Sequence, residues 1–164
     1  MECGVTDAEV LAAALLHDTV EDTGATLAQL EESFGANVAK YVAEVSDDKS
    51  LAKGERKRMQ VEHAGTASDG AKLIKIADKV CNFRDLQVNP LWGKQRTQGY
   101  FVWGKAVVDK ARGVNVKLDA IVDDVLKGYF VYRETGETVP CIPEGADMEK
   151  LLEEYYALCT SGGK

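Results

Sequence analysis

The stretch from residue 15 to residue 23, Leu-Leu-His-Asp-Thr-Val-Glu-Asp-Thr, concentrates the side chains that could do chemistry. His17 and Asp18 are adjacent, and Glu21 and Asp22 follow one turn later. An imidazole beside a carboxylate suits a borderline-to-hard divalent cation such as Mn²⁺, Fe²⁺ or Zn²⁺, and the two further carboxylates are acid–base candidates. Caps and turns are also common uses of Asp. A metal site would need a further ligand from a distant part of the chain.

A second polar group interrupts an apolar stretch, residues 73–83. Asp78 and Asn82 are four residues apart and share one face of a predicted helix. Burying a carboxylate in such surroundings is costly unless it is paired or coordinates a metal. A metal ligand and an ordinary ion pair with a neighbouring Lys or Arg therefore stay open as alternatives for Asp78.

A basic run after residue 48 gives the third candidate. Lys53 follows two aspartates and precedes a glycine, which predicts a corner where a helix N-terminus could meet an anion. The basic side chains of residues 56–58 fit either phosphate contacts or a solvated helix face. Because the run lacks interleaved aromatic residues and the whole chain carries a net charge of −7, we do not expect a nucleic-acid partner.

The composition bounds the setting of these groups. The 164 residues suit one compact domain, and no apolar run approaches the roughly 20 residues that span a membrane. Four cysteines without a CxxC pair indicate reduced thiols and a cytoplasmic protein. Charge is segregated: residues 1–48 carry a net −10 (1 basic, 11 acidic), residues 49–117 a net +9 (15 basic, 6 acidic) and residues 118–164 a net −6 (4 basic, 10 acidic). This pattern fits either a site that holds a cation beside an anionic ligand, or mutually paired surfaces.

Helical periodicity predominates, which predicts an all-α fold. Thr6 and Glu9 fit a capping box that opens the first helix, and Thr26 and Gln29 fit a second. Residues 133–146, with two prolines, predict an irregular linker. Further helices are expected near residues 38–45, 53–64, 71–86 (with Leu73, Ile74, Ala77, Val80, Cys81 and Phe83 buried), 94–111, 117–127 and 147–159, and one short β-like run at 129–132.

Taken together, these stretches resemble the HD superfamily of metal-dependent phosphohydrolases. The likeness is strongest to the hydrolase domain of RelA/SpoT-type alarmone enzymes, in its small single-domain animal form. It covers about residues 5–128 and includes the 60-residue spacing between Asp18 and Asp78. The segments that carry it are residues 13–23, 47–49, 55–58, 70–79 and 82–86, with 100–103 as weaker support.

The resemblance implies an HD-domain helical bundle over residues 1–130, followed by an acidic extension with one helix over residues 131–164. It implies one divalent metal, typically Mn²⁺, and hydrolysis of guanosine 3′,5′-bis(diphosphate) to guanosine diphosphate and pyrophosphate by metal-activated water. The residues that match the family's site are His17, Asp18 and Asp78 as metal ligands, Glu21 and Asp22 as the groups that orient or deprotonate water, and Lys53 and Asn82 as substrate contacts.

One departure from the family pattern affects the expected activity. The family supplies another histidine ligand upstream of the HD pair, whereas no histidine precedes His17, and His63 is not expected at the metal. We therefore expect a bundle without the family's N-terminal helices, weakened metal binding, and little or no hydrolase activity. Two other functions stay open: an NADPH 2′-phosphatase or other nucleotide phosphohydrolase, and a non-catalytic module that binds a nucleotide or a protein. The last helix could cover the core face that the missing N-terminal helices would leave exposed, mediate a homodimer or pack against solvent.

Overall fold

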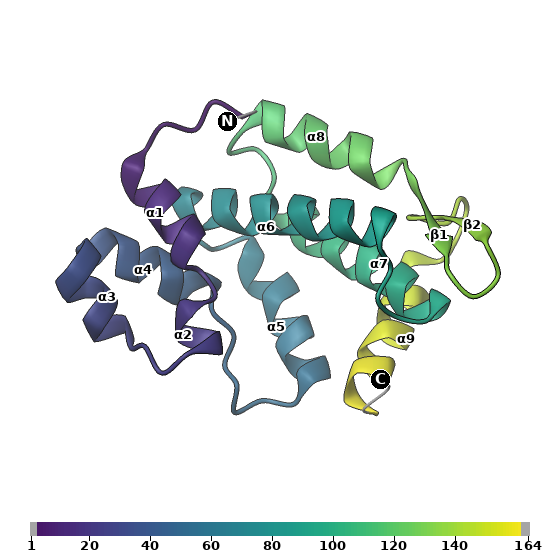
Figure 1. The fold of residues 1–164 in the computed structure, drawn as a ribbon, viewed down its shortest axis with the longest axis horizontal. Helices are drawn as coiled ribbons and strands as arrows, with labels where there is room; N and C mark the ends of the chain where they lie inside the picture. The colour runs from purple at the N-terminus through teal and green to yellow at the C-terminus, as the bar shows by residue number, and fades with distance from the viewer. Residues whose placement is uncertain (1–2, 162–164) are drawn as a thin grey trace.

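The computed structural model describes residues 3–161, and these fold into packed helices with one β-hairpin at the edge (Figure 1). The expected all-α class is confirmed. Within the described residues no helix is both long and apolar enough to cross a membrane. The elements in chain order are α1 (Ala8–Leu16), α2 (Thr19–Asp22), α3 (Leu27–Phe34), α4 (Ala36–Val45), α5 (Lys53–Ala64), α6 (Asp69–Val88), α7 (Lys94–Ala111), α8 (Val116–Leu126), β1 (Tyr129–Tyr132), β2 (Glu137–Pro140) and α9 (Met148–Thr160).

Helix α6 is the central element of the fold. It runs across the middle of Figure 1 and contacts α1, α4, α7, α8 and β1. Its N-terminus is fixed by Ser68, whose hydroxyl accepts a hydrogen bond from the backbone N–H of Ala71. The helix is two residues longer at each end than the sequence predicts. Because it is enclosed on several sides, any polar side chain on its inner faces must find a partner there.

Two hydrophobic clusters pack on opposite ends of this helix. One lies among α1, α3, α4 and the start of α6, around Val10, Val42 and Ile74. The other lies among α5 to α9 and the hairpin, around Phe83 and Trp103. Leu73 of α6 packs against both clusters, so the two cores meet along α6. Functional side chains placed on this seam are held from both sides.

Some local predictions need correction. The Thr26–Gln29 capping box is confirmed, but Asp7, not Thr6, caps α1, because its carboxylate accepts hydrogen bonds from two backbone N–H groups of the first turn. On α6, Cys81 is exposed rather than buried, and Lys75 and Lys79 take buried positions instead. The predicted linker contains β2, which pairs antiparallel with β1.

The C-terminal helix α9 packs onto α5 and α7. Tyr155 and Cys159 are buried in the same cluster as Trp103, and the rings of Tyr155 and Trp103 stack with their centres 6.1 Å apart. On the surface Arg58 of α5 forms an ion pair with Glu153 of α9. In the described residues α9 covers the core on the side of α5 and α7, and its role in a homodimer stays a prediction. The boundary at residue 130 stays a prediction.

Close packing of α7 against α6 gives a first prediction. A methyl group at Gly104 would lie 2.5 Å from the ring of Phe83, which is fully buried and cannot turn away. We expect Gly104→Ala to lower the free energy of unfolding by about 1 kcal/mol, because overpacking costs about 1–3 kcal/mol and exceeds the gain of about 1 kcal/mol in helix propensity. Urea denaturation measures the change. Gly24→Ala, whose methyl group meets no atom within 4 Å, is the control, and equal stability of both variants would contradict the packing.

Candidate active site

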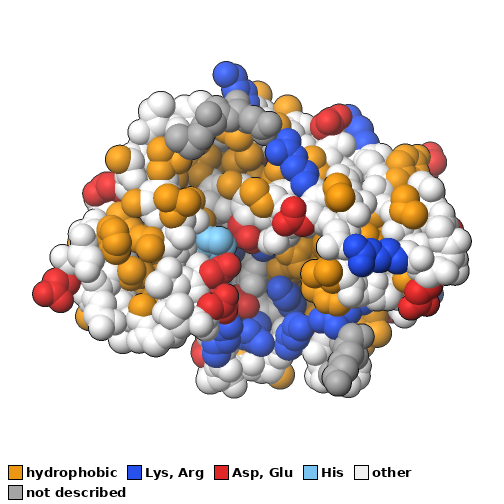
Figure 2. Space-filling model, in the orientation of Figure 1, with side chains coloured by type: hydrophobic (Ala, Val, Ile, Leu, Met, Phe, Trp, Pro, Cys, Tyr) orange, Lys and Arg blue, Asp and Glu red, His pale blue; other side chains and the backbone are white. Residues whose placement is uncertain are grey.

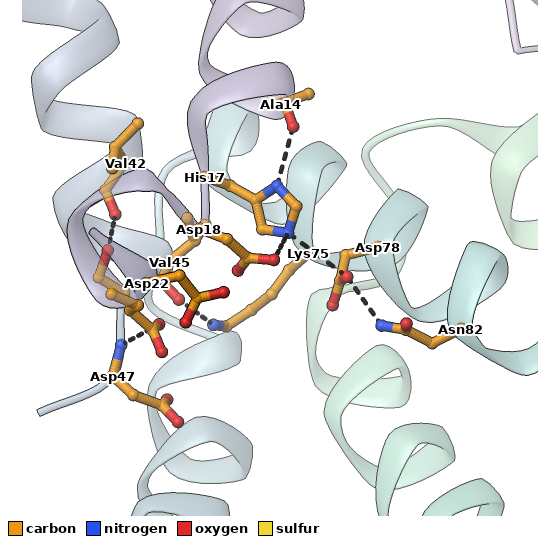
Figure 3. Close-up of polar contacts among 12 residues, drawn as sticks. Ala14, His17, Asp18, Asp22, Val42, Val45, Asp47, Lys75, Asp78 and Asn82 are labelled. Atoms are coloured by element: carbon orange, nitrogen blue, oxygen red, sulfur yellow. Dashed lines mark hydrogen bonds and ion pairs between the residues drawn. The ribbon is translucent and has the colours of Figure 1, made fainter. Parts of the chain in front are cut away.

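His17, directly after α1, points its imidazole at α6. Its Nδ1 donates a hydrogen bond to the carbonyl oxygen of Ala14 at 2.9 Å, which fixes the ring. Its Nε2 lies 3.2 Å from Asp18 Oδ2 and 3.5 Å from Asp78 Oδ1, is buried, and makes no hydrogen bond of normal geometry (Figure 3). The Asp78 carboxylate, acting against burial, raises the pKa of His17 to about 9. This ring nitrogen therefore occupies a position that favours a cation.

Asp78 is the acceptor at which several donors converge. Its Oδ1 accepts a hydrogen bond from Asn82 Nδ2 at 2.8 Å, and its Oδ2 from Lys79 Nζ at 2.6 Å. The predicted shared face of Asp78 and Asn82 is confirmed. Burial acts to raise the pKa of Asp78, but the Lys79 ammonium and His17 outweigh burial and hold that pKa well below the usual range. The group stays an anion between two positive charges.

His17 and Asp18 are followed by the short helix α2, which directs its two carboxylates, Glu21 and Asp22, to different sides. Asp18 stands before α2, and its partial burial raises its pKa. Glu21 turns inward, where it accepts a hydrogen bond from the backbone N–H of Asp47 at 2.7 Å and lies 3.1 Å from Lys49 Nζ. Asp22 turns outward, with 69% of its side chain exposed and Lys49 Nζ at 3.8 Å. Of the two, Glu21 alone lines the cavity beside His17.

A polar cavity of about 200 Å³ collects these groups. Figure 2 shows acidic side chains gathered beside a histidine in a hollow whose lower edge is lined by basic side chains. The cavity opens between α1, α5 and α6, at the seam of the two hydrophobic clusters. Its polar and ionisable lining residues are His17, Asp18, Glu21, Asp47, Lys57, Gln60, Lys75, Asp78, Lys79, Asn82 and Tyr100.

The structure separates the predicted substrate contacts. Asn82 lines the cavity, whereas Lys53, at the start of α5, is exposed and does not line it. Its role stays a prediction. The basic groups inside the cavity are Lys57, Lys75 and Lys79. Lys57 belongs to the basic run for which phosphate contacts were one alternative, whereas the cavity positions of Lys75 and Lys79 are not predicted by the sequence. Their i,i+4 spacing, which places them on one face of α6, is the signal that could have indicated them.

The donors near His17 have the chemistry that a divalent cation requires. An imidazole whose other nitrogen bonds a backbone carbonyl, with two carboxylate oxygens in front of its free nitrogen, fits Mn²⁺ or a similar ion. Within residues 3–161, however, no three or more His, Cys, Asp or Glu side chains are arranged as a full metal-binding group. His63 is exposed and lines a different cavity. His17, Asp18 and Asp78 therefore fit as a partial set that water or a substrate oxygen must complete.

Both sequence and fold match known proteins over most of the chain. An HD domain family model matches residues 1–99. The guanosine-3′,5′-bis(diphosphate) 3′-pyrophosphohydrolase MESH1 of Drosophila melanogaster is 52% identical over 129 residues, covering 77% of this chain and 72% of that protein. Human MESH1 is 52% identical over 128 residues, with the same two coverages of 77% and 72%. A solved structure, described as that of a metazoan ortholog of SpoT that hydrolyses ppGpp, aligns with a TM-score of 0.72 and 53% identity over 74% of this chain and 70% of that chain.

The pair formed by the half-buried Asp78 and the buried Lys79 gives a second prediction. Lys79 is only 5% exposed, so Asp78→Asn leaves its ammonium without the carboxylate that pairs with it. We expect the free energy of unfolding of the metal-free protein to fall by about 3 kcal/mol, as for other broken buried pairs. Urea denaturation in the presence of a chelator measures it.

Asp22→Asn, at an exposed carboxylate, is the matched control and should change stability by less than about 0.5 kcal/mol. Replacing both partners, as Asp78→Leu with Lys79→Leu, should recover most of the loss, because the Lys79 ammonium is no longer left without its carboxylate. Similar losses in the Asp78 variant and the control would show that the pair does not stabilise the seam.

Proposed function

The chain belongs to the HD domain family, and from this membership we propose that it hydrolyses guanosine 3′,5′-bis(diphosphate) to guanosine diphosphate and pyrophosphate. The observation that supports this most directly is the convergence of His17, Asp18 and Asp78 at one wall of a polar cavity. The relatives that are 52% identical to it carry this activity in their name. We propose that the three residues hold one divalent cation, Mn²⁺.

When bound, such a cation lowers the pKa of a water molecule and polarises phosphoryl oxygens. We assign proton removal from the attacking water to Glu21, because its carboxylate lines the cavity. Asp22 faces solvent and acts only through Lys49, whose ammonium also lies beside Glu21. The oxygen of water bonds to the phosphorus that carries the 3′ oxygen, and the bond between that phosphorus and the 3′ oxygen breaks. Water loses one proton and the 3′ hydroxyl gains one, so the step balances.

Two adjoining cavities support a nucleotide substrate. A second cavity of about 460 Å³ shares Asn82 and Tyr100 with the first and is also lined by Trp92 and Asp85. The rings of Trp92 and Tyr100 lie 5.5 Å apart, so an aromatic surface adjoins the ionic one. A nucleotide combines these two chemistries, because its base stacks on aromatic rings while its phosphates seek cations. We propose that Asn82 contacts the substrate where the two cavities join.

The third prediction concerns turnover. In keeping with the weakened metal binding expected from the sequence, we expect the purified protein to release pyrophosphate from guanosine 3′,5′-bis(diphosphate) only slowly, at a rate that rises as Mn²⁺ is added, because three protein donors hold the ion weakly. Glu21→Gln keeps the size of the side chain but cannot accept the proton, so kcat should fall by about 10²–10⁴-fold. A coupled pyrophosphate assay measures both effects.

Asp48→Asn is the matched control for Glu21→Gln, because Asp48 is exposed and its carboxylate accepts hydrogen bonds from Ser50 of its own turn. It should leave kcat within about twofold. If phosphate were released from NADPH faster than pyrophosphate from the guanosine substrate, the protein would still be a phosphohydrolase, but NADPH would be its substrate. No release from either nucleotide at any Mn²⁺ concentration would leave a binding module.

A further inference from the structure

Two ammonium groups inside the polar cavity have no carboxylate partner. Lys75 is 6% exposed, and its Nζ donates a hydrogen bond to the carbonyl oxygen of Val45 at 3.3 Å (Figure 3). Lys57 places its Nζ 3.7 Å from the ring centre of Trp103. Among residues 3–161, neither lysine forms an ion pair within 4 Å, although carboxylates line the same cavity.

Those carboxylates are already engaged by other donors. Each has at least one partner closer than Lys57 or Lys75, so the two lysines cannot be counted as their counterions. The partners are Lys49 and the backbone N–H of Asp47 for Glu21, Arg56 and Gln60 for Asp47, Lys79 and Asn82 for Asp78, and His17 for Asp18.

Such an arrangement is unfavourable in the ligand-free protein. Burial is the largest cause that lowers the pKa of both Lys57 and Lys75 to about 8, and the Lys79 ammonium also lowers it, while the field of the Asp47 carboxylate offsets this only in part. The cation–π contact of Lys57 offsets only part of its desolvation, and Lys75 has a single backbone carbonyl. A buried or half-buried charge without an ion-pair partner destabilises a fold. An anion bound in the cavity would supply the missing partner.

The place of the two lysines specifies which anion. They come from α5 and α6, and they line the same 200 Å³ cavity as His17, Asp18 and Glu21. In Figure 3 the side chain of Lys75 extends from α6 toward Val45, past the HD pair. A group held between them and the proposed cation must be small and multiply charged. Lysine binds phosphate as a compact point charge, so two of them fit the two phosphates of a pyrophosphate group.

From this juxtaposition we propose that Lys57 and Lys75 form an anion subsite that binds the pyrophosphate group of the substrate. The inference rests on the proposed function and adds to it the residues that hold the transferred group. Lys79 is not part of the subsite, because Asp78 already engages its ammonium. The subsite takes the role that the sequence suggested for Lys53.

Inorganic pyrophosphate is the probe, because it needs neither the nucleoside nor turnover. Titration calorimetry of the full chain in the presence of a chelator compares the natural protein with Lys57→Met and Lys75→Met. Methionine keeps the unbranched apolar stem and removes the charge. We expect each variant to bind pyrophosphate on the order of tenfold to a hundredfold more weakly, the effect of a lost charged hydrogen bond. Orthophosphate should bind the natural protein more weakly than pyrophosphate.

Thermal unfolding of the same variants separates a binding role from a structural one. Because each substitution removes an unpaired buried charge, we expect the melting temperature to stay unchanged or to rise while affinity falls. Lys117→Met, at an exposed lysine of α8, is the matched control and should change neither quantity. A fall in melting temperature with unchanged pyrophosphate affinity would overturn the subsite, and so would affinity within twofold of the natural protein in both variants.

A measurement on the natural chain covers the case in which a variant does not fold. Amine acetylation followed by mass spectrometry should show that pyrophosphate slows modification of Lys57 and Lys75 but not of Lys117. Equal modification with and without pyrophosphate would overturn the subsite. Pyrophosphate binding through these lysines without nucleotide hydrolysis would support the subsite and overturn the proposed function. Hydrolysis of the guanosine substrate with unchanged KM in both methionine variants would support the proposed function and overturn the subsite.

Discussion

The carboxylate of Asp78 joins the two halves of the molecule. It lies on the central helix α6 and accepts hydrogen bonds from Lys79 and Asn82 of the same helix. Its Oδ1 also lies 3.5 Å from Nε2 of His17, which follows α1. α1 belongs to one hydrophobic cluster, whereas Lys79 lies over the ring of Trp103 in the other. A half-buried anion at such a joint is stabilised by partners from both sides, so the relative position of the two clusters and the geometry of the site depend on the same group.

The segregation of charge along the chain is explained by this joint. The acidic first block supplies His17, Asp18 and Glu21 to one wall of the cavity, and the basic middle block supplies Lys57 and Lys75 to the other. The alternative of mutually paired surfaces also holds in part, since Lys49 pairs with Glu21. Neither interpretation of the charge pattern predicts that the two walls differ. The carboxylates of the acidic wall (Asp18 and Glu21) have donors of the protein as partners, whereas the ammonium groups of the basic wall (Lys57 and Lys75) have no carboxylate within ion-pair distance in the described residues.

The acidic wall could be predicted from the sequence, and the basic wall could not. His17 and Asp18 are adjacent, and Asp78 stands out because a carboxylate in an apolar helix needs a partner. The run of residues 56–58 carries three positive charges in succession, and which of them faces inward depends on how α5 is rotated against α7 and α9. Arg56 forms an ion pair with Asp47, Lys57 packs its ammonium on the ring of Trp103, and Arg58 forms an ion pair with Glu153 on the surface. The rotation of α6 is equally undetermined by its apolar residues. With Lys75 and Lys79 turned inward, Cys81 is left exposed, against the expectation from hydropathy.

The part of the chain beyond the family match also shapes the site. The HD domain match ends at residue 99, yet Trp103 forms the surface on which Lys57 lies, and its indole N–H donates a hydrogen bond to the backbone carbonyl of Lys57 at 2.9 Å. Tyr155 of α9, which is 3% exposed, stacks with the Trp103 ring at a centroid distance of 6.1 Å. Both rings are buried and closely packed, so they have little room to move. They hold the Lys57 ammonium at the cavity without neutralising it. The C-terminal helix therefore contributes to the basic wall by its packing, although it places no charge there itself.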